Sequence, residues 1–317
     1  MISFVVIGKN EDWRLEKCLS AISRNAVKEL TQPYELIYVD SQSVDGSIEL
    51  AKEYADKVFL VTGECNAAIG RNIGAKEAKG DILFFLDGDM ELREGVLQSV
   101  LTDKGQLKRP FMAGVEYDIL FDNNWNKKEE RLRHPFKEDT EWYESRPSTG
   151  MFVIEKSVWD NVGGMDNRFT KSQDYEFGFR AYGKGYPVLR VGKLWVNHYT
   201  RYYDVRPDSL SRYKYPAMLT RKYCLKPYAF KTLFMWNYSG YLLFLLLLLL
   251  GVTGKAWLLI SYLFILVYRT IRVLQKTKVR LNWLTIMYRR FAKDLLLIYY
   301  VFTYFPRQPQ VLYERIK

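Results

Sequence analysis

The stretch Ile82-Leu-Phe-Phe-Leu-Asp-Gly-Asp89 decides the fold of this 317-residue chain. Its five apolar residues predict a buried strand, and Asp87 and Asp89 follow where that strand would leave the carboxyl edge of a sheet. Open α/β sheets bind their ligands at this edge. Two carboxylates one residue apart can hold a divalent cation, Mn²⁺ or Mg²⁺, that also binds the phosphates of a nucleotide. Asp-Gly is also a strong turn signal, so a plain solvated turn is the alternative.

The residues before this stretch alternate between strand and helix patterns. Short apolar runs predict strands at residues 2–7, 35–39, 58–61 and 82–86. Apolar residues at helical spacing predict helices near residues 15–26, 47–55 and 66–78, with Gly80 as a stop signal. Alternating elements of this length predict right-handed crossovers and a mostly parallel α/β sheet with flanking helices.

The alternation becomes irregular beyond Asp89. We expect strands at residues 113–121 and 149–155, a turn at Gly163-Gly164 and a helix at residues 174–184. Residues 122–147 are polar, charged and rich in Trp and Tyr, as expected of a mobile substrate loop. The chain has no Walker A and no Gly-x-Gly-x-x-Gly motif, which disfavours P-loop and dinucleotide chemistry.

The net charge of +11 lies entirely in the last part of the chain. Residues 1–229 hold 34 basic and 34 acidic side chains, whereas residues 230–317 hold 13 basic side chains against Asp294 and Glu314. A nucleic-acid-binding protein would carry this excess on its folded domain. Basic residues beside apolar segments instead suit an anionic membrane surface, so we expect membrane lipids and no nucleic acid as partners.

Apolar segments in the same region predict membrane insertion. Residues 233–252 are uncharged over about the length that a bilayer core requires, and residues 256–268 are apolar but shorter. The shorter segment either re-enters partway or returns across the membrane with Arg269 and Arg272 snorkelling. Residues 269–293 are heavily basic, which places them in the cytosol and, for a hairpin, the N-terminal domain with them. Residues 295–305 are too short to span and are interpreted as interfacial.

The predicted organisation therefore has four parts. These are a catalytic domain at residues 1–205, a basic juxtamembrane segment at 206–232, a helical hairpin at 233–274 and a basic cytosolic or interfacial tail at 275–317. The scattered Cys18, Cys65 and Cys224 form no disulfide framework and fit a reducing compartment. The N-terminus lacks a basic region, so it is expected to be a strand and not a signal peptide.

Five further residues could carry chemistry, and each also has a structural interpretation. Asp40 follows the second expected strand and can accept a hydrogen bond from a base or ribose, or close a turn. Arg71 lies near a helix start and can meet a pyrophosphate, or pair on the surface. Asp174 can be a general base or a helix N-cap, and His198 can bind a metal or be structural. Glu11, in Gly8-Lys9-Asn10-Glu11, is by itself most simply a loop residue.

Taken together, four stretches resemble the family 2 glycosyltransferases, which are inverting enzymes with the GT-A fold. Val39-Asp-Ser-Gln-Ser-Val-Asp-Gly-Ser47 is similar to the family's nucleotide-binding turn, and Val5–Glu11 to its first strand. Arg71-Asn-Ile-Gly74 followed by Lys79–Asp89 is similar to the approach to its Asp-x-Asp motif. Gly163-Gly-Met-Asp166 with Gln173-Asp174 and Arg180 is similar to the segment that bears its catalytic base.

The resemblance implies a single displacement at the anomeric carbon of a nucleotide-diphosphate sugar, UDP- or GDP-linked. It implies Asp174 as the base that takes the acceptor's proton. The cation would be held by Asp89 with Asp87, and His198 is a further candidate ligand. The residues expected to hold the nucleotide sugar are Glu11, Asp40, Arg71, Asp87 and Gly88.

Departures from the family pattern narrow the expected function. Ser41 replaces a second acid that is common in the family's nucleotide-binding turn, and Gln173 replaces a Glu that is common before the catalytic base. The first strand lacks the usual Pro-x-Tyr-Asn-Glu ending, which weakens the expectation that Lys9 contacts the nucleobase. The Gln-x-x-Arg-Trp motif of processive synthases is missing, so we expect transfer of one sugar per acceptor. The membrane segment suggests that the acceptor is a lipid-linked saccharide. The enzyme would be integral to a membrane with its catalytic domain in the cytosol, which for a bacterium is the inner membrane. The alternatives are a polyprenyl-phosphate glycosyltransferase and a membrane protein that binds nucleotide sugars without turnover.

Overall fold

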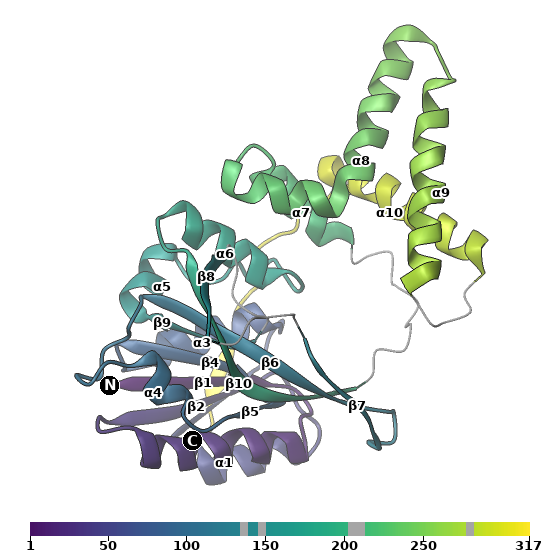
Figure 1. The fold of residues 1–317 in the computed structure, drawn as a ribbon. Helices are drawn as coiled ribbons and strands as arrows, with labels where there is room; N and C mark the ends of the chain where they lie inside the picture. Colours follow the sequence, from purple (N-terminus) through teal and green to yellow (C-terminus); the bar gives the residue numbers. More distant parts are fainter. Residues whose placement is uncertain (134–138, 145–149, 202–212, 277–281) are drawn as a thin grey trace. The chain divides into compact units, whose positions relative to one another are not determined.

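The computed structural model describes residues 1–133, 139–144, 150–201, 213–276 and 282–317. The chain forms two compact units (Figure 1). The first contains Met1–Asp204 together with Arg307–Lys317, and the second contains Val205–Pro306. The first unit is an α/β domain, and the second is helical.

The four strands expected in the first ninety residues are confirmed and form the parallel part of the sheet. They are β1 (Ile2–Gly8), β2 (Tyr34–Asp40), β3 (Lys57–Val61) and β4 (Ile82–Asp87), in the spatial order β3-β2-β1-β4. The three expected helices connect them as α1 (Trp13–Glu29), α2 (Ser47–Tyr54) and α3 (Ala67–Glu77). Because β1 runs first to β2 on one side and later meets β4 on the other, the strand order reverses between β1 and β4.

Every residue of β1 is buried, since helices cover both faces of the sheet. Phe4 and Val6 belong to the core that α1 covers, and Val5 and Ile7 belong to the core that α3 covers. Alternate residues of one strand thus point into different cores, which is why the strand is apolar throughout rather than alternating.

The second half of the sheet mixes parallel and antiparallel strands. Its strands are β5 (Met90–Leu92), β6 (Phe111–Phe121), β7 (Lys127–Leu132), β8 (Glu141–Glu144), β9 (Phe152–Glu155) and β10 (Val188–Arg201). Its helices are α4 (Val96–Val100), α5 (Lys156–Val162) and α6 (Gln173–Gly183), and Gly163 follows α5 with a left-handed φ of 88°. The sheet is therefore mostly parallel at one end and mixed at the other.

The expectation of one long substrate loop at residues 122–147 is wrong, because this range contains two strands. Its described parts include β7, which pairs with β6, and β8, which pairs with β10; residues 134–138 and 145–147 lie outside the described part. Each residue of β7 is exposed, so this strand has no apolar face for a sequence pattern to reveal.

The end of the chain returns to the α/β unit, which the sequence did not predict. Strand β11 (Tyr313–Arg315) pairs antiparallel with β3, from Tyr313 opposite Val61 to Arg315 opposite Phe59. The ring of Tyr313 lies 5.9 Å from that of Phe59, and its hydroxyl donates to Glu77 at 2.8 Å. The tail therefore covers the β3 edge of the sheet, and the last eleven residues belong to the α/β unit.

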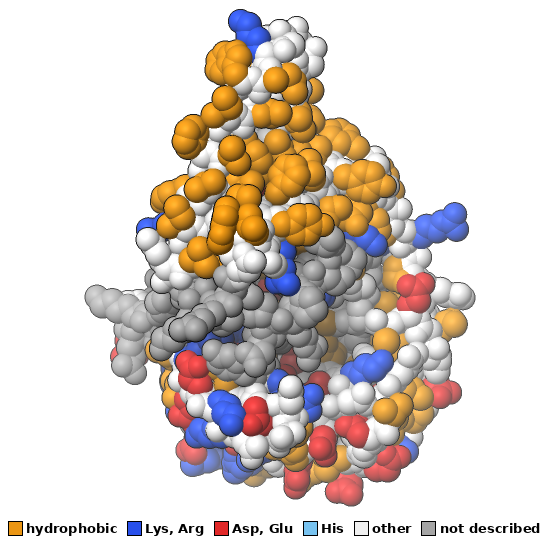
Figure 2. Space-filling model, turned by 90° about the vertical axis from the view of Figure 1, so that its right-hand side faces the viewer, with side chains coloured by type: hydrophobic (Ala, Val, Ile, Leu, Met, Phe, Trp, Pro, Cys, Tyr) orange, Lys and Arg blue, Asp and Glu red, His pale blue; other side chains and the backbone are white. Residues whose placement is uncertain are grey.

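The helical unit contains α7 (Lys214–Tyr223), α8 (Pro227–Thr253), α9 (Leu258–Lys276) and α10 (Trp283–Thr303). Two helices, at Pro227–Thr253 and Leu258–Gln275, are long and apolar enough to cross a membrane. Only 33% and 22% of their apolar windows are buried within the structure. Hydrophobic side chains accordingly gather over the surface of this unit, whereas the α/β unit shows both charge signs (Figure 2).

Arg269 does not extend outward as a snorkelling residue would. Its guanidinium is buried on α9 and pairs with the fully buried Asp294 of α10 at 2.9 Å. Tyr262 donates to the same carboxylate at 3.0 Å, and Arg269 also donates to Ser239 of α8. Arg272 is exposed. The only acidic residue between positions 230 and 313 thus joins α10 to α9.

Candidate active site

The candidate site lies where β1 and β4 end, at the point where the strand order reverses. This is the position at which open α/β sheets form their ligand crevice. Gly88 donates its N–H to the carbonyl of Ile7 at 2.8 Å, which holds the two strand ends together. A Cβ on either Gly8 or Gly88 would lie 2.9 Å from Cγ of Glu11, so both glycines leave room for this side chain. The structure thus brings Glu11, Asp87 and Gly88 together.

Asp87 is held by Arg71 from α3. The guanidinium Nη2 lies 2.5 Å from Oδ1 of Asp87. Burial raises the pKa of Asp87 above its ordinary value, although the positive charge of Arg71 acts to lower it. Arg71 is 1% exposed, and its Nε and Nη1 have no hydrogen-bond partner among the described residues. Two buried donors beside a strand-end carboxylate suit a ligand with anionic oxygens.

Gly150 closes over the same carboxylate. A Cβ at this position would lie 1.9 Å from Oδ2 of Asp87 and 2.2 Å from its Cγ. No side chain larger than hydrogen fits there while Asp87 keeps its place. Asp87 is therefore confined between Arg71 and the backbone at residue 150.

Asp89 faces His198, which comes from β10. The imidazole Nε2 lies 3.3 Å from Oδ2 of Asp89, and Nδ1 lies 2.7 Å from Oδ1 of Asp118 on β6. The backbone N–H of Tyr199 donates to the carbonyl of Asp89 at 2.9 Å, which fixes the two strands' relative position. Burial would lower the pKa of His198, but Asp89 and Asp118 raise it well above its ordinary value. Burial would raise the pKa of Asp89, but His198 and then Arg14 bring it below its ordinary value.

Glu11 and Arg14 complete the acidic site. Arg14 Nη2 lies 2.8 Å from Oε2 of Glu11, and its Nη1 lies 3.6 Å from Oδ2 of Asp89. Burial, and next the charge of Asp89, raise the pKa of Glu11 to about 8. Three carboxylates here, those of Glu11, Asp87 and Asp89, compete for the positive charges of Arg14, Arg71 and His198. An added divalent cation would relieve this repulsion.

Asp40 is fully buried at the end of β2 and organises a turn. Its Oδ1 accepts from the N–H of Ser43 at 2.6 Å, and its Oδ2 accepts from the hydroxyls of Ser43 and Tyr38 at 2.6 and 3.0 Å. Asn10 joins this turn to the end of β1, since its N–H donates to Oγ of Ser43 at 2.9 Å. The turn-forming interpretation of Asp40 describes its contacts in this structure, and a direct contact with a base remains a prediction.

Asp174 lies in the first turn of α6 and is 7% exposed. Ser172, with a left-handed φ of 60°, is the N-cap, so Asp174 is not the capping residue. The positive end of the helix stabilises a carboxylate in this turn. The loop before α6 is bound to α3, because Asn72 donates to the carbonyl of Met165 at 2.8 Å and accepts from its N–H at 2.8 Å. The segment that bears Asp174, the expected catalytic base, is thus hydrogen-bonded to the helix that carries Arg71.

The Asp89–His198 pair fits a divalent cation. A carboxylate oxygen and an imidazole nitrogen 3.3 Å apart can ligate one ion. Glu116, Asp118 and His198 also offer atoms within 4.8 Å of one another. We favour the Asp89 side of His198, because Arg133 lies 2.5 Å from Glu116, whereas Arg14 lies 3.6 Å from Oδ2 of Asp89. A cation among those three would have to displace that guanidinium.

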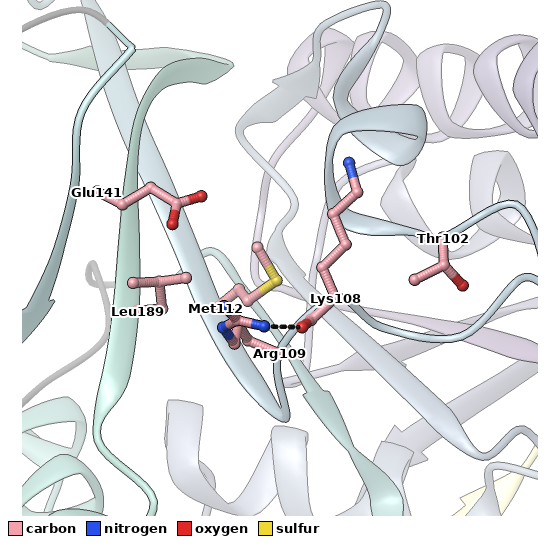
Figure 3. A pocket seen from close by; sticks show the side chains of 6 residues that line it. All are labelled: Thr102, Lys108, Arg109, Met112, Glu141 and Leu189. Carbon is pink, nitrogen blue, oxygen red and sulfur yellow. Dashed lines mark hydrogen bonds between the residues drawn. The ribbon is translucent and has the colours of Figure 1, made fainter.

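A separate pocket of about 270 Å³ opens at the other end of β6 and β10 (Figure 3). Met112 and Leu189, near the starts of these strands, lie on its wall, whereas Asp118 and His198 are farther along them. The two basic side chains that line this pocket, Lys108 and Arg109, donate hydrogen bonds to nearby backbone carbonyls. Lys108 Nζ donates to the carbonyl of Ser99 at 2.9 Å, and Arg109 donates to that of Lys108 at 3.0 Å. None of the predicted site residues lines this pocket.

Arg14, Asp118 and Gly150 contact the site but were not predicted from the sequence. Arg14 is a cation in the first turn of a helix, where the helix dipole disfavours it, and this misfit was a usable signal. Glu116 and Asp118 are two acids on one face of an apolar strand, which implies buried partners. Nothing in the local sequence indicates that Gly150 lies over Asp87.

Comparisons with known proteins find glycosyltransferases among the relatives of this chain. A 4,4'-diaponeurosporenoate glycosyltransferase from Staphylococcus haemolyticus is 31% identical over 128 residues, 38% of this chain and 33% of that protein. An undecaprenyl-phosphate 4-deoxy-4-formamido-L-arabinose transferase from Aeromonas hydrophila is 34% identical over 97 residues, 29% of each. The chain thus spans a third or less of these relatives.

The fold agrees as well. The crystal structure of GalNAc-T7 with UDP, GalNAc and Mn²⁺ matches 69% of this chain and 47% of that chain, with a TM-score of 0.53 and 17% identity. The family described as glycosyl transferase family 2 matches residues 3–174, more than half of the sequence. The chain has a GT-A fold, and it belongs to glycosyl transferase family 2.

Proposed function

We propose that this enzyme transfers one sugar from a nucleotide-diphosphate sugar to a lipid-linked saccharide at a membrane surface. The observation that carries the chemistry is the meeting of Asp87, Asp89 and His198 at the strand-order reversal, with the buried donors of Arg71 beside them. The crystal structure that matches this fold was solved with UDP and Mn²⁺, which supports a UDP-linked donor and Mn²⁺.

The reaction that fits these residues is a single displacement with inversion. The acceptor oxygen forms its bond to the anomeric carbon while the bond from that carbon to the diphosphate breaks, and the nucleoside diphosphate leaves as an anion. Asp174 accepts the proton of the attacking hydroxyl. Arg71 binds the donor's anionic oxygens through Nε and Nη1, and Glu11 and Gly88 shape the floor beneath the donor. Asp89 and His198, with Asp87 beside them, would hold a divalent cation, which would supply positive charge to the leaving diphosphate.

The helical unit supports a lipid-linked acceptor. Helices α8 and α9 have the length and apolar surface of a membrane hairpin, and the basic segment at 206–232 lies beside it in the sequence. A lipid-linked saccharide presents its reactive hydroxyl at the membrane surface, which a tethered catalytic unit can reach. The relative named for undecaprenyl phosphate supports the closest alternative, in which the lipid phosphate itself is the acceptor.

The return of the chain to the sheet constrains the membrane topology. The chain leaves the α/β unit after residue 204 and rejoins it at residue 307, where β11 pairs with β3. Both ends of the helical unit are therefore on one side, so the number of crossings is even. With α8 and α9 crossing, α10 stays on the side of the catalytic unit, as an interfacial helix would. The basic flanks of the hairpin support a cytosolic location for that side.

One assay tests the function and separates the alternatives. Full-length protein in detergent with Mn²⁺ is screened against nucleotide sugars for nucleotide release, with a lipid-linked saccharide or polyprenyl phosphate as acceptor. The saccharide is expected to support turnover, and Asp174→Asn to reduce it at least a hundredfold while the exposed Asp160→Asn does not. Near-normal turnover of Asp174→Asn with polyprenyl phosphate would favour the alternative acceptor, because a phosphate needs no base. Nucleotide binding without release for any donor would indicate a non-catalytic protein.

Cysteine labelling tests the topology. In a chain with Cys18→Ala, Cys65→Ser and Cys224→Ser, a membrane-impermeant maleimide applied to intact cells is expected to label Lys255→Cys, between α8 and α9. It is expected to spare Lys104→Cys, an exposed position of the α/β unit. Labelling of both or of only the second would contradict the proposed orientation.

A further inference from the structure

We propose that Asp118 is a positioning residue for the reaction: it holds His198 through Nδ1 so that Nε2 faces Asp89 and the divalent cation. This inference rests on the cation site of the proposed function. It concerns a carboxylate on β6 that touches neither donor nor cation, and that acts only through the imidazole.

The hydrogen-bond chemistry of the ring supports this role. Oδ1 of Asp118 lies 2.7 Å from Nδ1, a distance that requires a proton on Nδ1, because two acceptors would repel each other. Arg133 Nη1 also lies 3.4 Å from Nδ1, but a guanidinium offers only donors and cannot fix that proton. With Nδ1–H committed to Asp118, Nε2 is the ring nitrogen that can donate a lone pair to a cation, and it lies 3.3 Å from Oδ2 of Asp89. Carboxylate–histidine–metal arrangements of this kind orient many metal ligands.

The sheet holds Asp118 in this position. Asp118 and His198 are direct register partners on the parallel strands β6 and β10, and they are 4% and 7% exposed. The arginines near Asp118 are more distant than the imidazole, with Arg131 at 3.8 Å and Arg133 at 3.9 Å. Arg133 pairs with Glu116 at 2.5 Å. The shortest polar contact of Asp118 in the described chain is thus the one to His198.

The test measures Mn²⁺ binding without turnover. The electron paramagnetic resonance signal of free Mn²⁺ is titrated with full-length protein in detergent in the presence of UDP. Asp118→Asn is expected to weaken Mn²⁺ binding by about 10- to 100-fold. The matched control is Glu129→Gln, which removes an exposed acid from the adjoining strand β7 and is expected to bind Mn²⁺ as the wild type does.

A double variant distinguishes action through His198 from a general loss of negative charge. His198→Ala is expected to weaken Mn²⁺ binding, and adding Asp118→Asn to it is expected to cause no further loss. Additive losses, or wild-type affinity of Asp118→Asn, would overturn the positioning role while leaving His198 as a ligand. Wild-type affinity of His198→Ala would instead remove His198 from the cation site of the proposed function.

A second measurement needs no variant that must fold. Long-range ¹H–¹⁵N spectra of the wild-type histidines with Mg²⁺ and UDP report which ring nitrogen of His198 carries the proton. Protonated Nδ1 with an unprotonated Nε2 is expected. A ring protonated only at Nε2 would overturn the inference.

Discussion

Gly150 determines where the first carboxylate of the Asp87-Gly-Asp89 stretch can lie. An added Cβ would be 1.9 Å from Oδ2 of Asp87, so Gly150→Ala must move this carboxylate away from Arg71. We expect kcat/KM for the donor to fall at least tenfold, which corresponds to about 1.4 kcal/mol of transition-state stabilisation. Steady-state kinetics of nucleotide release measure the effect. Gly251→Ala is the control, because a Cβ there meets nothing within 4 Å; equal kinetics of the two variants would show that Asp87 tolerates displacement.

Glu11 makes the stability of the metal-free enzyme depend on pH. Its pKa is raised from 4.5 to about 8 in the folded state, so between these values the folded chain binds more protons than the unfolded chain. Stability contributed by the protonated side chain is complete below about pH 4.5 and is lost as pH rises through about 8, with a slope of at most about 1.4 kcal/mol per pH unit. Thermal unfolding with EDTA from pH 5 to 9 is expected to show a flatter decline for Glu11→Gln than for the wild type. The exposed Glu64→Gln should follow the wild type, and parallel curves for all three proteins would refute the role of Glu11.

Site residues that directly follow a strand or begin a helix could be predicted from the sequence. Site residues that are brought in by the pairing of distant strands could not. Asp87 and Asp89 follow an apolar run that could only be a buried strand, so their position at the sheet edge was predictable. Asp118 meets His198 only because β6 and β10 are parallel neighbours in one register, and no local pattern states which strands pair. Gly150 meets Asp87 for the same reason, since β9 pairs with β4 across a long sequence separation.

At the scale of elements, apolar patterning predicted the buried strands and helices but missed polar and very short strands. Strands β1 to β4 and helices α1 to α3 each carry apolar residues that fill one of two cores. Strand β7 is exposed along its whole length, and β5 and β11 have three residues each, too few for any periodicity. These strands exist because a neighbouring edge offers backbone hydrogen bonds, which is tertiary information.

The Arg269–Asp294 pair joins α9 to α10, and we expect it to stabilise the helical unit. Asp294→Asn leaves the buried guanidinium of Arg269 without its charge partner, which typically costs about 3–5 kcal/mol. The double variant Arg269→Met with Asp294→Leu removes both charges and is expected to be more stable than Asp294→Asn alone. Thermal unfolding of the full-length protein in detergent measures this order. The exposed Arg272→Met is the control and should unfold like the wild type; an equally stable Asp294→Asn would show that the pair does not hold α10.

At the scale of the whole molecule, the chain closes on itself: residues after the helical unit complete the α/β unit. Strand β11 supplies backbone partners to β3, and Ile316 and Lys317 extend the contact through the N–H groups that they donate to the carbonyl of Val58 at 2.9 and 3.3 Å. Without this tail, β3 would present an open edge to other chains. The tail therefore protects the sheet and ties the end of the helical unit to the catalytic unit.

Removing residues 307–317 is therefore expected to destabilise the catalytic unit although none of them lies at the candidate site. The truncated protein should be cleaved faster within the α/β unit by a low concentration of protease and should aggregate more readily, because the exposed β3 edge can pair with other chains. Tyr313→Ala is the milder variant: it removes the ring contact with Phe59 and the hydrogen bond to Glu77, with an expected loss of about 1–2 kcal/mol. Glu314→Ala changes an exposed side chain of the same strand and keeps the backbone pairing, so it should match the wild type. If truncation left the protease sensitivity of the α/β unit unchanged, β11 would be an accessory contact, and the even number of membrane crossings would lose its structural basis.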